Sequence, residues 1–163
     1  MKQNKELLLS YGIILLPFLV SLFLYPYLPA SVQVHFNLQQ EANGSLDKNL
    51  FVFGMPLLVL LLQSLLYFSS KVKEIPNPNL QKMERFLLPV LFAILYLSLI
   101  LKNLNPSFPL LKGVALSLGL VFLLIGNYLP KKLETGKKAA PRWMAYGFLF
   151  FGCLTLLIAL FMQ

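Results

Sequence analysis

Apolar residues fall into five long runs along this chain, separated by short polar segments. The runs cover residues 7–28, 50–68, 86–101, 110–129 and 143–162. About 20 consecutive apolar residues are enough for a helix to cross the hydrocarbon core of a bilayer. The pattern therefore predicts five transmembrane helices, with the third run the shortest.

Composition supports this class of protein. Hydrophobic residues make up 58% of the 163 residues and charged residues only 12%, which is too few to cover the surface of a soluble domain. None of the polar segments is long enough to act as a linker between domains. We therefore expect a single all-α transmembrane domain over residues 1–163, a bundle of about five helices in contact with the lipid bilayer.

The basic residues are distributed unequally among the polar segments. Eleven of the 14 lysines and arginines precede the first run, or lie between the second and third runs or between the fourth and fifth. Basic loops stay on the cytoplasmic side of a membrane. We therefore predict a multi-pass plasma-membrane protein with a cytoplasmic N-terminus and an extracellular C-terminus. The net charge of +8 then reflects orientation and anionic lipid, and we expect no nucleic-acid partner.

The longest polar segment, residues 30–49, faces outward in this topology. Apolar and polar residues alternate from residue 32 to residue 37, which predicts a strand. Its polar face carries Gln33, His35 and Asn37. The opposite face carries valines and a phenylalanine and is expected to be buried.

The second half of this segment predicts a turn and a helix start. Asn43-Gly44 is a turn signal, and it follows the predicted strand. Ser45 or Asp47 then stands where a side-chain oxygen accepts hydrogen bonds from the first amides of the second helix.

Three kinds of chemistry compete for the outward segment. His35, Glu41 and Asp47 are candidate metal ligands, but their spacing matches no compact metal motif. His35 is also a candidate general base, yet no nucleophile accompanies it. The third interpretation, which we favour, is a ligand-binding surface. It is made by His35, Asn37, Glu41 and Asp47. It predicts no catalytic residue, no bound metal and no cofactor.

Small residues in the last two runs indicate close helix packing. They are Ala115, Gly119, Gly126, Gly147 and Gly152. Ion transport, by contrast, usually requires ionisable groups inside the membrane. The five runs contain few charged or long polar side chains, so a small transporter subunit is the weakest functional alternative.

The outward segment resembles the first outward loop of SdpI-type bacterial membrane proteins and of a related domain of unknown function. The matching residues, in register, are Leu28, Pro29, Val32, His35, Phe36 and Asn37. Gly44 and Asp47 also match, after four extra residues. Gln33 stands where these proteins usually have proline.

A second match lies at the cytoplasmic end of the fourth run. The segment "GNYLPK", residues 126–131, is similar to the end of an inner helix in SdpI proteins. The segment that normally follows it is replaced here by "KLETGKKAAPRW". Asn127, Tyr128 and Lys131 are therefore candidates for a cytoplasmic docking site. The simpler interpretation is that they anchor a helix end at the lipid interface.

The resemblance implies immunity to, or sensing of, a membrane-active antimicrobial peptide. It further implies a cytoplasmic repressor that an occupied protein holds at the membrane. We expect a non-enzymatic protein that uses residues 30–49 to recognise a peptide toxin. The alternative from another class is a membrane-embedded enzyme with a histidine or metal centre at the outer surface.

Overall fold

The computed structural model describes residues 2–37, 39–72, 78–129 and 141–161, and five long helices account for most of them. These helices are α1 (Lys2–Phe23), α2 (Met55–Val72), α3 (Pro78–Leu104), α4 (Leu110–Tyr128) and α5 (Arg142–Phe161). All five are long and apolar enough to cross a membrane. The predicted all-α bundle is therefore confirmed, and the chain is a multi-pass membrane protein.

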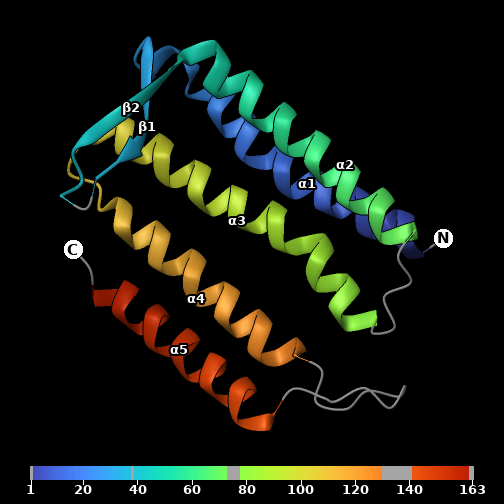
Figure 1. Ribbon diagram of the computed structural model, residues 1–163. Helices are drawn as coiled ribbons and strands as arrows, with labels where there is room; N and C mark the ends of the chain where they lie inside the picture. The colour runs from blue at the N-terminus through green and yellow to red at the C-terminus, as the bar shows by residue number, and fades with distance from the viewer. Residues whose placement is uncertain (1, 38, 73–77, 130–140, 162–163) are drawn as a thin grey trace.

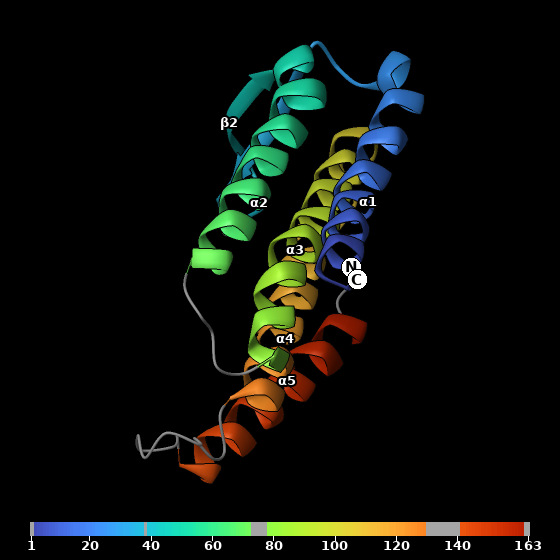
Figure 2. The same ribbon diagram turned by 90° about the vertical axis from the view of Figure 1, so that its right-hand side faces the viewer.

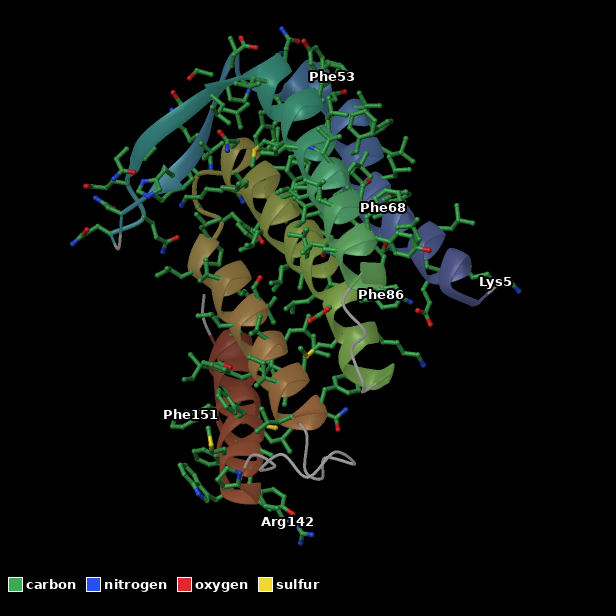
Figure 3. The ribbon with its side chains drawn as sticks, turned by 45° about the vertical axis from the view of Figure 1, so that its right-hand side comes forward. Lys5, Phe53, Phe68, Phe86, Arg142 and Phe151 are labelled. Carbon is green, nitrogen blue, oxygen red and sulfur yellow. The ribbon has the colours of Figure 1, made fainter. Side chains whose placement is uncertain are left out.

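The helices lie side by side, with α3 between the α1–α2 pair and the α4–α5 pair (Figures 1 and 2). Large apolar side chains cover the outside of the bundle, where lipid would surround them. Figure 3 shows three of them, Phe53, Phe68 and Phe151, pointing away from the helix axes. Lys5 and Arg142 mark the ends of α1 and α5 that lie away from the β-hairpin.

Two predicted spans differ from the observed helices for local reasons. The first helix ends at Phe23 rather than residue 28 because Pro26 has no amide hydrogen to continue the α-helical ladder, and the chain continues as a 3₁₀ turn, η1 (Tyr25–Tyr27). The third helix is longer than its apolar run, because polar residues at both ends continue it beyond the predicted range 86–101.

The second span begins with an irregular turn. Residues Leu50–Gly54 form a π-helical turn, η2, and the Met55 amide donates to the Leu50 carbonyl. Pro56 follows, and a proline has no amide hydrogen for the helical ladder. The wider turn places the Phe51 ring on the Tyr96 ring, stacked with centroids 4.7 Å apart.

Close packing of α4 on α5 is confirmed at three of the predicted small residues. A Cβ atom on Gly126 would lie 2.8 Å from the Ala145 carbonyl oxygen, and Gly119 and Gly152 are equally crowded by the partner helix. The prediction is wrong for Gly147, where an added Cβ would meet nothing within 4 Å. Gly147 faces away from α4 because the contact runs along only one side of α5.

The polar segment forms a β-hairpin of β1 (Ser31–Phe36) and β2 (Ala42–Asp47), paired antiparallel. The predicted strand is confirmed, but the predicted Asn43-Gly44 turn is wrong because both residues lie within β2. The chain reverses at residues 37–41 instead, with Gln40 at a positive φ of 62°. This register pairs Val32 with Leu46, so that both side chains contact the apolar core.

The core lies at the hairpin end of the bundle. Val32 and Phe51 are completely buried there, beside Ile14, Tyr96 and Ile100 from α1 and α3. The hairpin is therefore packed on the helix ends rather than extended into solvent. We call this the hairpin end, and the opposite end, where α1 and α3 begin, the far end.

Candidate functional site

A shallow hollow between the β-hairpin and the end of α3 is the candidate ligand site. Its volume is about 340 Å³, within the size range of small ligand pockets, and it is lined by Pro29, Ser31, Gln33, Phe36, Gln40, Ala42, Lys102, Asn103 and Pro106. We call it the hairpin groove. Its walls come from both ends of β1, from the hairpin turn, and from the connection between α3 and α4.

Asn103 fixes β1 against α3. Its Oδ1 accepts a hydrogen bond from the Gln33 amide at 2.8 Å, and its Nδ2 donates to the Gln33 carbonyl at 2.8 Å. A side-chain amide here replaces a third strand, because it satisfies both backbone groups that point away from β2. The Gln33 side chain is not used in this bridge and lines the groove.

Two further contacts hold the other walls. The Leu110 amide, at the start of α4, donates to Gln40 Oε1 at 3.0 Å. Lys102 Nζ donates to the Pro106 carbonyl at 2.7 Å and closes the turn after α3. The Asn103–Gln33 and Leu110–Gln40 contacts each join segments 70 residues apart in the sequence, whereas the Lys102–Pro106 contact is local.

The lining suits a peptide-like ligand. Amides and a hydroxyl on Gln33, Gln40 and Ser31 supply both donors and acceptors. Phe36 and two prolines supply apolar surface, and Lys102 is the single charged side chain among the lining residues. A chain with backbone amides and apolar side chains, or a group with a negative charge, would meet complementary chemistry here.

Two of the sequence-predicted site residues shape the hairpin turn. Asn37 Oδ1 accepts from the Glu41 amide at 2.8 Å, and Asn37 Nδ2 donates to Glu41 Oε2 at 2.9 Å. Their backbones are also joined, because the Asn37 amide donates to the Glu41 carbonyl. Asn37 thus lies beyond β1, so the strand alternation that gave it a common face with His35 ends before it.

His35 and Asp47 occupy different parts of the hairpin. His35 is exposed and its Nδ1 donates to Asn43 Oδ1 across the two strands. Asp47 Oδ1 accepts from the Asn49 amide at 2.8 Å and from the Leu50 amide at 3.4 Å. Asp47 therefore caps the helical segment that leads into α2, as predicted.

The candidate metal ligands are not gathered. Within the described residues, no three histidine, cysteine, aspartate or glutamate side chains lie close enough to hold an ion. Glu41 is engaged at the hairpin turn, whereas Asp47 lies at the other end of the hairpin, opposite Ser31. The alternative of a metal enzyme therefore receives no geometric support from His35, Glu41 and Asp47.

The two described residues among the docking-site candidates, Asn127 and Tyr128, lie at the far end. Asn127 is exposed and Tyr128 half-buried at the last turn of α4, while Lys131 lies outside the described residues. The Leu129 amide closes this turn by donating to the Ile125 carbonyl. Asn127 is thus available at the surface, and its backbone remains within the helix.

Sequence reasoning missed the residues that build the groove from the helix side, Lys102 and Asn103. Their position in the predicted topology was the available signal. Both residues directly follow the third run, on the same side of the membrane as residues 30–49 in a five-span arrangement. Which of those nearby polar residues would bond to β1 depended on the hairpin register.

A buried polar cluster at the far end was also missed. Arg85 and Glu6 form an ion pair between α3 and α1, with Arg85 only 3% exposed. Gln63 from α2 lies beside them and is 1% exposed. The hydrophobic pattern places Arg85 in the loop before the third span, because Arg85 precedes the apolar run 86–101.

Comparison with known proteins gives one match. Residues 12–60, from the middle of α1 through the hairpin into α2, match a family described as a domain of unknown function (DUF1648). No curated protein and no solved structure matches the chain. The matched range contains the whole hairpin, and it excludes Lys102 and Asn103.

Proposed function

We propose that this chain is an SdpI-like protein of the bacterial plasma membrane that recognises a membrane-active peptide at the hairpin groove. Recognition would serve immunity to that peptide or sensing of it, without catalysis. The observation that carries the proposal is the groove itself, held in shape by the Asn103–Gln33 bridge and lined by amides, apolar rings and one lysine.

Orientation supports this assignment. Among the described residues, the far end carries more basic residues than the hairpin end, including Lys5, Lys82 and Arg142, which favours a cytoplasmic location for that end. The hairpin groove then opens on the outer surface, where a secreted peptide arrives. The match of residues 12–60 to a domain family covers the hairpin, which is also the part that resembles SdpI proteins.

The proposal includes a signalling partner at the other surface. As in SdpI, a cytoplasmic repressor would be held at the membrane when the groove is occupied. Asn127 and Tyr128, at the cytoplasmic end of α4, are the described residues proposed for that contact. Lys131 follows them in the sequence.

A protection assay tests the peptide-binding role. The chain is expressed in a sensitive bacterial host, which is challenged with a panel of membrane-active peptides. Wild type is expected to raise the inhibitory concentration of at least one peptide about tenfold or more, a change of about 1.4 kcal/mol if the effect were one of affinity. Absence of protection against the whole panel would argue against immunity.

Two glutamines of the hairpin form a matched pair of variants. Gln33→Ala removes a side chain from the groove while leaving the backbone groups that Asn103 binds. Gln39→Ala removes an exposed glutamine that does not line the groove. Protection is expected to be lost in the first variant and kept in the second, at equal membrane levels. Full protection by Gln33→Ala would refute the groove as the recognition site.

A further inference from the structure

The polar cluster at the far end joins the first three helices. Arg85 Nη1 donates to Glu6 Oε2, which ties α3 to α1. Gln63 Nε2, from α2, donates to Ser10 Oγ at 3.2 Å and to the Arg85 carbonyl at 2.8 Å. We call Glu6, Ser10, Gln63 and Arg85 the far-end cluster.

Three polar atoms of this cluster have no partner among the described residues. Nε and Nη2 of Arg85 and Oε1 of Gln63 are buried and accept or donate no hydrogen bond within that part of the chain. The Tyr67 ring lies 5.6 Å from Arg85 Cζ, and its π face attracts the cation without replacing the missing acceptors. Buried donors and acceptors without partners destabilise the arrangement that contains them, most strongly on a charged group.

In the packed arrangement of the helices there is no room for a water molecule or an ion beside these three atoms. All three atoms have almost no surface accessible to water, so neither a water molecule nor an ion is able to touch them. A bound ligand is therefore a poor explanation. A movement of the helices that admits water would satisfy all three atoms together.

The two ends of the bundle differ in how water would affect their stability. At the hairpin end, Ile14, Phe51 and Tyr96 form an apolar core, which water would destabilise. At the far end, Lys5 and Lys82 are exposed next to Glu6 and one turn before Arg85, respectively. Water is thus close to the far-end cluster, where the buried atoms of the described residues that lack partners would gain hydrogen bonds by hydration.

We infer that the far-end cluster is a latch: the ends of α1, α2 and α3 separate there, hydrating Arg85 and Gln63, while the hairpin end stays closed. The Glu6–Arg85 ion pair holds the closed form, and the unpaired atoms favour the open form. The balance between these two contributions sets how often the far end opens. The latch is independent of what the hairpin groove binds.

Two serines of α1 provide the test. Ser10 and Ser21 are both fully buried, and each hydroxyl donates to the carbonyl three residues earlier. Ser10 belongs to the far-end cluster, eight residues from the start of α1, whereas Ser21 lies two residues from its hairpin end. At 1.5 Å per residue these positions are about 12 Å and about 3 Å from their helix ends. If the distance from the helix end alone set the labelling rate, a cysteine at position 21 would therefore react faster than one at position 10.

The experiment uses Ser10→Cys and Ser21→Cys, each in a Cys153→Ala background that removes the chain's only cysteine. Purified full-length protein in lipid nanodiscs is treated with a small, water-soluble methanethiosulfonate, and labelling is followed by mass spectrometry. We expect Ser10→Cys to react at least tenfold faster than Ser21→Cys. Adding Glu6→Gln is expected to accelerate only the Ser10→Cys reaction, by threefold or more.

The opposing outcomes are distinct. Equally slow labelling at both positions means that the far end stays closed, and it overturns the latch. Equally fast labelling means general loosening of α1, and it also overturns the latch. Helix content and monodispersity are measured for each variant. If Glu6→Gln does not fold, Glu6→Asp replaces it, and faster labelling of Ser10→Cys alone is again expected because the shorter carboxylate weakens the ion pair to Arg85.

Discussion

Asn103 is the residue on which the shape of the hairpin groove most depends. Replacing it with alanine removes the two hydrogen bonds to the Gln33 backbone, both 2.8 Å long. It also leaves the Gln33 amide and carbonyl without partners on the side of β1 that faces α3. We therefore expect Asn103→Ala to loosen the hairpin without unfolding the helices.

The size of the effect follows from the burial of these groups. A hydrogen bond contributes about 1 kcal/mol net, and a fully buried group left without a partner costs about 1–3 kcal/mol. Gln33 is only half-buried beside the groove, so water would partly replace Asn103. We expect Asn103→Ala to lower the free energy of opening of the hairpin by about 2–3 kcal/mol. This corresponds to a roughly 30- to 140-fold larger equilibrium constant for opening.

Hydrogen exchange of the hairpin amides in detergent micelles measures this local opening directly. Amides of β1 and β2 in Asn103→Ala are expected to exchange faster by the factor above, while those in the middle of α3 keep the wild-type rate. Asn105→Ala is the matched control, because Asn105 accepts a single 3.1 Å bond from the exposed Ser107 amide. Its effect is expected to stay below about 0.5 kcal/mol.

Amides of β1 and β2 that exchange less than threefold faster in Asn103→Ala than in wild type would contradict this role of Asn103. An effect of Asn105→Ala equal to that of Asn103→Ala would contradict it as well. Either result would mean that apolar packing of Val32 and Leu46 holds the hairpin by itself. The groove would then keep its shape without the bridge.

Two further predictions concern stability. Gly126→Ala is expected to lower the free energy of unfolding by about 1–3 kcal/mol, because the new Cβ would lie 2.8 Å from the Ala145 carbonyl. Gly147→Ala, in open space, should raise it by up to about 1 kcal/mol. Thermal midpoints in micelles that shift equally would contradict the observed α4–α5 contact. Asp47→Ala is expected to lower the stability of the capped helix start by about 1 kcal/mol, and Asp47→Asn by much less. Hydrogen exchange of the Asn49 amide, which donates to Asp47, measures both effects. Equal losses in these two variants would rule out capping by the side-chain oxygen.

The sequence by itself determined the class of the protein. Five apolar runs predicted five helices, because backbone groups in lipid must be satisfied within each segment and run length alone decides whether a helix spans. The alternation over residues 32–37 predicted β1, and Ser45 or Asp47 was predicted to cap the following helix, a role that Asp47 takes. These features depend on residues close together in the chain.

Tertiary structure decided the hairpin register, the groove and the far-end cluster. Asn43-Gly44 favours a turn locally, yet burial of Val32 and Leu46 against the core places both residues inside β2. Gln33 meets Asn103 across 70 residues, and Glu6 meets Arg85 across 79. No local pattern encodes such pairs, because each depends on how far one helix is rotated and shifted against its neighbour. Packing of the whole bundle sets that relation, and with it the polar side chains that come together.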